Sequence, residues 1–374
     1  MKRQGSDGTT PCRAALLVEQ CWHEVPGGTA GAAVDLLRSF QGREDIIATA
    51  ISARHSEPPD PAYRPPVDVL ALPLTRQVLY QAWSRSSQPS IDRFVAGADL
   101  IHATGGIVPP THRPLVVTQH DLAWLHHPEL FTKHGVRFFR RTLSRTAERA
   151  TIVICPSKAT AADLSANGID NAKIRIIPWG VDQASASPTD VEQVRRRFDL
   201  GGRYVLSVGT LEPRKNLRRL VAAFAKAAPA DVSLAIVGPS GWQQDIESLI
   251  APLGDRAKRL GFLSRSDLVA LYSGATLFAY PSLFEGFGLP VLEAMVQGAP
   301  VLTSRGTATE ELVGECALLV DPYDVDSISE ALGDLLVGSS AVDSLGELGR
   351  QRARSYTWTR TADQTIAAYE QALA

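Results

Sequence analysis

The sequence predicts an α/β protein with two doubly wound parallel sheets, one in each half of the chain. Short β-rich runs alternate with helical stretches along the whole sequence. These runs are apolar throughout, which is typical of parallel strands covered on both faces. The chain has 374 residues, of which 44% are hydrophobic and 21% charged, so it is long enough for two ordinary domains.

The charge of the chain argues against one class of partner. A formal net charge of −2 gives no reason to expect nucleic-acid binding. The charge is unevenly distributed, because 20 Lys and Arg face 16 Asp and Glu up to residue 180, against 18 and 24 beyond it. We therefore expect the first half to be the one that meets any anionic surface.

The cysteines predict a reduced protein, because Cys12, Cys21, Cys155 and Cys316 are scattered and form no CxxC pair. No apolar run approaches the roughly 20 residues that cross a bilayer, and the polar N-terminus does not resemble a signal peptide. We expect a cytoplasmic protein, at most peripheral at the inner face of the membrane. The first ten or so residues read as a disordered lead-in.

The first half begins with the predicted strand RAALLVEQ and a loop in which Gly27, Gly28 and Gly31 precede an amphipathic helix. Such glycines let a ligand approach the backbone, although a plain tight turn explains them equally well. Further strands are DIIATAIS, DVLALP, DLIHAT, LVVTQ and ATIVICPS. Ligands of parallel sheets gather at the carboxyl ends of strands, where His120 and Asp121 follow LVVTQ. A structural histidine beside a turn-capping aspartate is the alternative.

Residues 131–150 predict a basic amphipathic helix. Four arginines recur every fourth residue on one face, namely Arg137, Arg141, Arg145 and Arg149. The ordinary interpretation is the solvated face of a surface helix. The alternative is a patch that meets an anionic membrane or a lipid-diphosphate acceptor.

The second half opens with a strand, turn and helix in YVLSVGTLEPRKNLRRLVAAFA. Gly209 and Thr210 end the strand, and Arg214 and Lys215 follow just before the helix. Adjacent cations beside free backbone amides suit a diphosphate, although exposed cations are often only solubilising. The strand VSLAIVG should bring a turn with Trp242 to the same edge.

The stretch from 275 to 304 reads as strand, turn, helix and strand. Pro290 opens the helix and Gly298 closes it. Glu285 lies in the turn and Glu293 in the first part of the helix. Two carboxylates beside an anion-binding helix start suit a ligand with hydroxyls next to phosphates, because a carboxylate accepts two hydroxyl donors. A nucleotide sugar has this layout.

These motifs resemble the donor site of the retaining glycosyltransferases of family 4, and the resemblance covers most of the chain. It implies that Glu285 holds sugar hydroxyls and that Glu293 holds ribose hydroxyls. In TQHDLAWLHHPE it implies that His120 lies against the reacting sugar. It implies contacts to sugar and phosphate from the turn residues Gly286, Phe287, Gly288 and Leu289. Contacts to the base are implied for Phe262 and Leu263.

One departure from the family concerns the phosphate contacts. Many relatives carry an arginine where this chain has Thr210, after Gly209. Lys215 is therefore the first predicted phosphate contact and Arg214 the second. The resemblance also implies that the loop with Gly28 borders the donor phosphates or the acceptor.

The family's fold is GT-B, in which two Rossmann-like doubly wound lobes face each other across a cleft. The resemblance implies an N-terminal acceptor-binding domain over 1–182 and a C-terminal nucleotide-sugar-binding domain over 183–356. KIRIIPWGVD, at 173–182, resembles the last strand of the first domain, and SASPTD reads as a linker after it. The final helix, 357–374, is expected to pack back on the first domain.

This chain's forms of two family motifs, GTLEPRKN and TQHDL, most resemble those of the mannosyltransferase branch that builds bacterial polysaccharides. We expect transfer of a hexose, mannose favoured, from GDP-mannose to a glycan or lipid-linked acceptor, with retention of configuration. No metal and no cofactor are expected, because no Asp-x-Asp motif ends a strand. A UDP- or dTDP-sugar donor is the alternative within this class. A GT-B nucleotide-sugar epimerase and a non-catalytic sugar-nucleotide sensor are the alternatives outside it.

Overall fold

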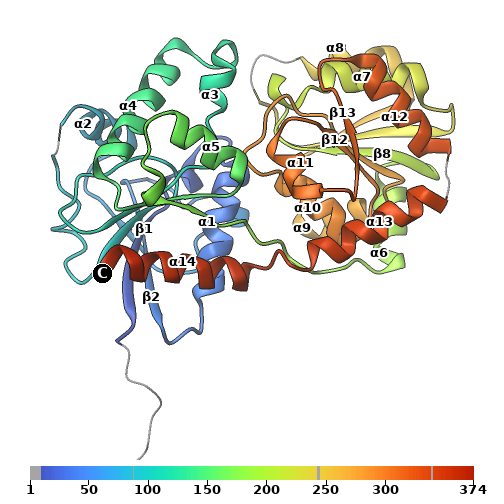
Figure 1. Ribbon diagram of the computed structural model, residues 1–374. Helices are drawn as coiled ribbons and strands as arrows, with labels where there is room; N and C mark the ends of the chain where they lie inside the picture. Colours follow the sequence, from blue (N-terminus) through green and yellow to red (C-terminus); the bar gives the residue numbers. More distant parts are fainter. Residues whose placement is uncertain (1–9, 87, 242–244, 338–339) are drawn as a thin grey trace, which may run out of the picture.

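The computed structural model describes residues 10–86, 88–241, 245–337 and 340–374. Two lobes lie side by side, each with a parallel sheet between helices (Figure 1). This confirms the predicted α/β class with two doubly wound sheets. Trp242 and the lead-in up to residue 9 lie outside the described residues.

The N-terminal lobe contains a seven-stranded parallel sheet in the order β3-β2-β1-β4-β5-β6-β7. The order reverses between β1 and β4, which is where ligands of such sheets bind. Its strands are β1 Cys12–Leu17, β2 Ile46–Ser52, β3 Val69–Ala71, β4 Leu100–Ala103, β5 Leu115–Thr118, β6 Ile152–Cys155 and β7 Ile174–Ile176. Its helices are α1 Gly27–Phe40, α2 Arg76–Arg85, α3 Ala123–His126, α4 Lys133–Arg149 and α5 Lys158–Ala166, with 3-10 turns at Glu19–Trp22, Pro61–Tyr63, Pro128–Leu130 and Asn171–Lys173.

The C-terminal lobe contains a six-stranded parallel sheet in the order β10-β9-β8-β11-β12-β13. Its strands are β8 Arg203–Val208, β9 Val232–Val237, β10 Ala257–Gly261, β11 Leu277–Tyr280, β12 Val301–Ser304 and β13 Leu318–Val320. Its helices are α6 Pro188–Arg197, α7 Leu217–Ala227, α8 Ile246–Ile250, α9 Arg265–Gly274, α10 Leu289–Gln297, α11 Ala308–Val313, α12 Val325–Val337 and α13 Ser340–Ala353, with 3-10 turns at Pro213–Lys215 and Ala251–Arg256.

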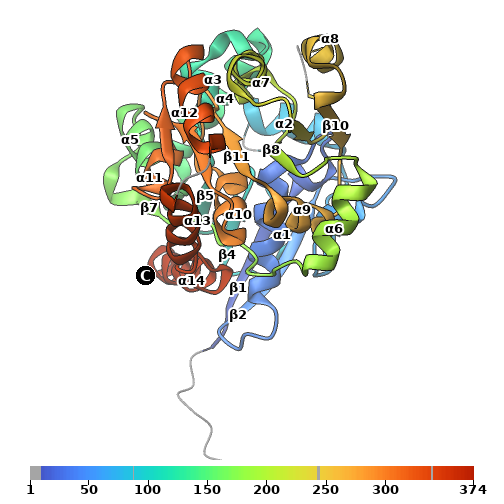
Figure 2. The ribbon, with the colours of Figure 1, turned by 90° about the vertical axis from the view of Figure 1, so that its right-hand side faces the viewer.

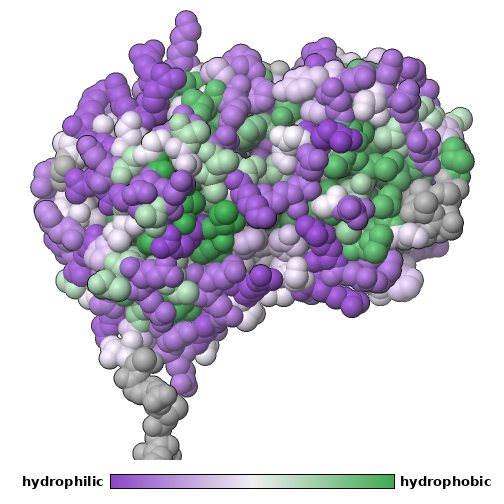
Figure 3. All heavy atoms as spheres, in the orientation of Figure 1, coloured by the Kyte–Doolittle hydropathy of each residue, from purple (hydrophilic) through white to green (hydrophobic). Residues whose placement is uncertain are grey.

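Several of the inner strands are buried along their whole length, as their apolar sequences predicted. All four residues of β4, β5, β6, β11 and β12 are buried. Burial on both faces follows from the helices that cover each sheet on two sides (Figure 2). The surface seen from the front is largely hydrophilic, with scattered apolar patches on both lobes (Figure 3).

The linker predicted from SASPTD is partly wrong. Pro188 begins α6, and Ser187 caps it, because the Ser187 hydroxyl accepts from the Asp190 N–H while the Asp190 carboxylate accepts from the Ser187 N–H. The sequence Ser-Pro-Thr-Asp therefore starts a helix, and only the residues before it connect the lobes.

The last helix, α14 Trp358–Leu373, returns to the N-terminal lobe and packs on α1, β4 and β5 (Figure 1). The Tyr369 hydroxyl lies 2.6 Å from His102 Nδ1, and His102 Nε2 lies 2.8 Å from the Thr118 hydroxyl. These polar groups are buried but satisfied, so they tie the last helix to β4 and β5.

The chain thus crosses between the lobes twice, and the crossings are in contact. The Val181 N–H donates to the Tyr356 carbonyl over 3.1 Å. A Cβ at Gly180 would lie 2.2 Å from the Trp358 nitrogen, so only glycine fits. The exact domain boundary after residue 182 stays a prediction.

Candidate active site

The donor loop, residues 281–288, connects β11 to α10 at the centre of the C-terminal sheet. The strand order of that sheet reverses between β8 and β11, so the loop lies at its switch point. Gly288 precedes α10 with a φ of +103°, and Gly298 ends the helix with a φ of +74°. Both angles favour glycine. The predicted turn, helix and strand are confirmed.

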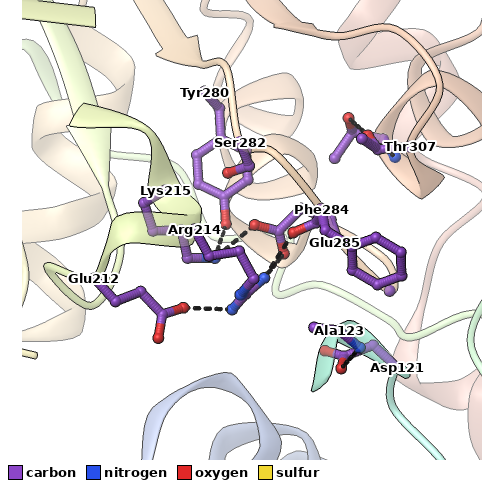
Figure 4. Close-up of polar contacts among 12 residues, drawn as sticks. Asp121, Ala123, Glu212, Arg214, Lys215, Tyr280, Ser282, Phe284, Glu285 and Thr307 are labelled. Carbon is purple, nitrogen blue, oxygen red and sulfur yellow. Dashed lines mark hydrogen bonds and ion pairs between the residues drawn. The ribbon is translucent and has the colours of Figure 1, made fainter. Parts of the chain in front are cut away.

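Glu285 is buried and pairs with two cations (Figure 4). Lys215 Nζ lies 2.6 Å from one carboxylate oxygen of Glu285, and Arg214 Nη1 lies 3.0 Å from the other. The second amino group of Arg214 lies 2.6 Å from Glu212 Oε1, and Lys215 also donates to the Tyr280 hydroxyl. A compact charged cluster therefore lies beneath the donor loop.

The electrostatics of this cluster keep Glu285 ionised. Burial acts to raise the pKa of Glu285, but Arg214 and Lys215 outweigh it and hold the pKa at about 2. Burial and the neighbouring Arg214 lower the pKa of Lys215, against the attraction of Glu285. Glu285, the predicted sugar contact, therefore lies beside Arg214 and Lys215, the predicted phosphate contacts. In this structure the three side chains pair with one another and not with a ligand.

A second feature is a cleft of about 310 Å³ between the lobes. It brings together predicted donor contacts from both halves of the chain, namely Gly28, Gly209, Thr210, Phe262, Leu263, Leu289 and Glu293. Tyr63 also lines it, with its ring 6.3 Å from the ring of Phe262. Three carboxylates line the cleft, of which Asp35 and Asp182 pair with Arg265 and Glu293 does not. A cleft with aromatic walls and a carboxylate that can accept hydroxyl groups has the character of a nucleoside site.

Glu293 differs from Glu285, because no cation of the described residues forms an ion pair with it. Its Oε2 accepts a hydrogen bond from the Tyr272 hydroxyl over 2.9 Å. Burial raises the pKa of Glu293, and the hydrogen bond from Tyr272 and the charge of Arg265 only partly oppose this. The carboxylate retains free acceptor capacity toward hydroxyl groups in the cleft.

His120 lies outside this cleft, in the N-terminal lobe. Its Nε2–H donates to the Thr104 carbonyl over 2.8 Å, which leaves Nδ1 as the acceptor in the neutral ring. Burial lowers the pKa of His120. Its ring centroid is 5.6 Å from that of Trp179. With Asp121 it lines a separate cavity in the N-terminal lobe.

The two lobes meet where His120 faces the donor loop. A Cβ at Gly286 would lie 2.0 Å from the His120 carbonyl oxygen, and one at Gly288 would lie 2.6 Å from Thr309 Cγ2. Phe287 is buried against Tyr356. These residues therefore pack against protein, whereas the sequence predicted that they meet the ligand, and their ligand contacts stay predictions.

Several residues of the site were not predicted. Glu212, Tyr280 and Tyr272 hold the predicted charged groups, and Tyr63 enters the cleft from the other lobe. Glu212 could have been found, because an acidic residue beside two buried cations often neutralises them. Tyr280 and Tyr272 gave no signal, since a tyrosine in a buried strand or helix is ordinary core.

Among the described residues, no group of three or more His, Cys, Asp or Glu side chains could hold a metal ion. Within the same residues, no helix is both long enough and apolar enough to pass through a bilayer.

Two facing Rossmann-like lobes with paired carboxylates and cations at the switch point define a GT-B glycosyltransferase. Two family models match the chain, "Glycosyltransferase Family 4" over residues 26–185 and "Glycosyl transferases group 1" over residues 189–352. The chain belongs to this glycosyltransferase family.

Curated relatives and solved structures agree with this assignment. The O-antigen chain mannosyltransferase B of Escherichia coli is 31% identical over 287 residues, which cover 72% of this chain and 74% of that protein. The MMP alpha-(1->4)-mannosyltransferase of Mycolicibacterium hassiacum is 33% identical, over 70% of this chain and 66% of that protein. The fold matches Anabaena HepE in complex with UDP and glucose, with a TM-score of 0.75 and 21% identity over 96% of this chain and 99% of that chain.

Proposed function

We propose that this glycosyltransferase moves a hexose, with retention of configuration, from a nucleotide-diphosphate sugar to a glycan or lipid-linked acceptor. The observation that carries the proposal is the cluster of Glu285, Arg214 and Lys215 beside an interlobe cleft that contains Glu293. Mannose and GDP-mannose are favoured, because two similar curated relatives are mannosyltransferases. Bacterial polysaccharide or cell-envelope biosynthesis is the favoured setting for the same reason.

The geometry supports a donor that binds in two places, with its nucleoside in the interlobe cleft and its diphosphate and sugar at the charged cluster. The nucleoside lies in the interlobe cleft, with its ribose hydroxyls on Glu293 and its base beside Phe262 and Leu263. The diphosphate takes over Arg214 and Lys215, and Glu285 is released to accept the hydroxyls of the sugar. The internal ion pairs thus hold the cations in place until the donor arrives.

The transfer step needs no metal ion or cofactor in this proposal. The bond from the anomeric carbon to the leaving phosphate oxygen breaks, and the acceptor oxygen bonds to the same face of that carbon. The departing phosphate oxygen takes the acceptor proton, and Arg214 and Lys215 neutralise its charge. His120 steadies the reacting sugar from the N-terminal lobe.

A UDP-sugar is the second candidate donor. Structures of Anabaena HepE contain UDP or UDP-glucose, and that protein matches this fold over 96% of the chain. The walls of the cleft do not distinguish the bases, because Phe262 and Tyr63 stack on any of them.

The deciding experiment is thermal unfolding of the purified protein with GDP, UDP, dTDP and their sugars. A ligand that binds only the folded state at a hundred times its Kd stabilises by about 2.7 kcal/mol. We expect a shift with GDP or GDP-mannose that is lost in Glu293→Ala and kept in Glu315→Ala, an exposed carboxylate elsewhere in the lobe. A shift with UDP species alone would discard mannose as the default sugar, and no shift with any nucleotide would refute the proposal.

The acceptor side of the proposal includes the basic face of α4. Arg137, Arg141 and Arg149 are exposed on that helix, while Arg145 Nη1 donates to the Ser86 carbonyl. Exposed cations on one face support contact with an anionic membrane that carries a lipid-linked acceptor.

A further inference from the structure

A cavity of about 540 Å³ lies in the N-terminal lobe, beyond the carboxyl ends of β4 and β5. His120 and Asp121 line it, and the backbone of His120 touches Gly286 of the donor loop. The cavity therefore begins beside the point where the lobes meet. It shares no lining residue with the interlobe cleft that holds Glu293. Its volume is in the range of small-molecule sites.

The cavity has a polar part and an aromatic part. Polar side chains accompany His120 and Asp121, among them Gln20 and Gln119. The aromatic part comes from α2, from α3, and from α4 with the turn before it, and consists of Tyr80, Trp124, Phe131, Phe138 and Phe139.

The aromatic rings contact one another and form a continuous wall. Trp124 stacks on Phe139 with centroids 6.1 Å apart, and Tyr80 stacks on Phe138 at 5.9 Å. Phe131 meets Phe139 edge to face at 6.2 Å. Phe139 is 38% exposed, so the wall extends to the protein surface.

Such a wall suits a hydrocarbon group better than a further sugar. A sugar carries hydroxyl groups that need hydrogen-bond partners when they are buried, and these rings provide few. Each buried methylene group of a hydrocarbon tightens binding by about fourfold. A molecule with a polar head and an apolar arm would fill both parts of the cavity.

We infer that the acceptor of this enzyme carries a hydrocarbon group, which lies among the aromatic side chains while its reacting hydroxyl lies beside His120 and Asp121. The inference rests on the proposed transfer reaction and specifies its acceptor. The occupant is the acceptor's own chain, because His120, which lines the polar part of the cavity, contacts Gly286 of the donor loop through its backbone.

The test is calorimetric titration with alkyl glycosides, which does not depend on activity. The probes are n-octyl α-D-mannoside and n-octyl β-D-glucoside below their micelle concentrations, each compared with its methyl glycoside. We expect the octyl glycosides to bind at least about tenfold more tightly, because three or more methylene groups enter the cavity. The heat capacity change should be negative, as it is when apolar surface is buried.

Two variants locate the binding in this cavity. Phe139→Ser removes part of the wall, and Thr142→Phe fills the space from α4, so each should abolish most of the octyl preference. Val78→Ser is the matched control, because Val78 is 50% exposed on α2 and does not line the cavity. Equal affinities for octyl and methyl glycosides, or an octyl preference that survives both variants, would overturn the inference.

A thermal-shift measurement with nucleotides on the same protein distinguishes failure of this inference from failure of the proposed function. A nucleotide-dependent thermal shift with equal octyl and methyl affinities would leave the transfer reaction intact and remove only the hydrocarbon group from the acceptor. The absence of any nucleotide shift would count against the transfer reaction, whatever the glycosides do.

Discussion

At the scale of residues, the two glutamates of the site, Glu285 buried and Glu293 half-buried, have opposite effects on stability. Glu285 has a pKa of about 2 in the folded chain, against 4.5 for the ordinary side chain, because Arg214 and Lys215 outweigh the effect of burial. Its ion pairs therefore stabilise the fold above about pH 4.5 and lose that effect as the pH falls toward 2. Burial raises the pKa of Glu293, so its charged form costs stability as the pH rises above 4.5.

We therefore predict opposite outcomes for two conservative substitutions. Glu285→Gln should lower the free energy of unfolding at pH 7 by about 3 kcal/mol or more, since it also takes the charged carboxylate away from Arg214 and Lys215. Glu293→Gln should raise it, with a gain that disappears below about pH 4.5. Denaturant unfolding of both variants at pH 7 and pH 3.5 measures this. A stabilised Glu285→Gln variant would contradict the electrostatic account.

The residues of this site were largely predictable, and their pairing was not. Glu285, Glu293, Arg214 and Lys215 were identified from local patterns and from the family resemblance, and the structure brings them to one region. That Glu285 binds both cations depends on two loops, 70 residues apart, meeting over a shared sheet edge. Local sequence patterns carry no information on such a contact.

At the scale of elements, α4 joins two functions proposed above. It supplies aromatic side chains to the cavity of the N-terminal lobe and arginines to the surface. These requirements are compatible, because residues four apart share one face of a helix and leave the others free.

Charge reversal on α4 tests its membrane contact. Arg137→Glu combined with Arg141→Glu should weaken sedimentation with vesicles rich in anionic phospholipid by at least about tenfold, given roughly 1 kcal/mol per basic residue. These two arginines are suitable because Arg145 also anchors the helix to Ser86. The control, Arg218→Glu with Arg354→Glu, changes the net charge equally at other exposed sites. Equal loss in both double variants would mean that net charge alone governs binding.

The strands were predicted more reliably than the helices. Most strands coincide with an apolar run, because burial on both faces leaves a strong signal. The exception is β10, Ala257–Gly261, an edge strand that contains Lys258 and Arg259 and was not predicted. The helices α6 and α13 were not predicted. The first begins at a Ser-Pro in a segment that resembles a linker, and the second contains glycines and many polar residues.

At the scale of the whole molecule, several contacts hold the lobes against each other. Glu311 Oε2 of α11 accepts from the N–H groups of Lys158 and Ala159 at the start of α5. Arg265 lies 3.3 Å from Asp35 and 3.5 Å from Asp182 across the cleft. The resemblance to a known family predicted that two lobes face each other, but these contacts depend on three-dimensional placement alone.

The closest approach between the lobes gives a prediction. In Gly286→Ala the added methyl group would meet the His120 carbonyl at 2.0 Å, and a backbone oxygen cannot move away as a flexible side chain can. We expect the lobes to separate, with a larger radius of gyration in X-ray scattering and at least about tenfold slower transfer. Gly202→Ala is the control, because nothing lies within 4 Å of the position of its Cβ. An unchanged radius of gyration and an unchanged transfer rate would mean that the donor loop moves to accommodate the methyl group while the lobes stay together.

The return of α14 also determines how the two lobes are joined. Because the chain passes between them at Val181 and again at Tyr356, a protease that cuts one passage leaves the other intact. Even with the second passage cut, the freed helix would remain bound through Tyr369 and His102 in the first lobe. Two adjacent passages act as a double hinge. They allow the two lobes to move apart, but they resist rotation of one lobe relative to the other.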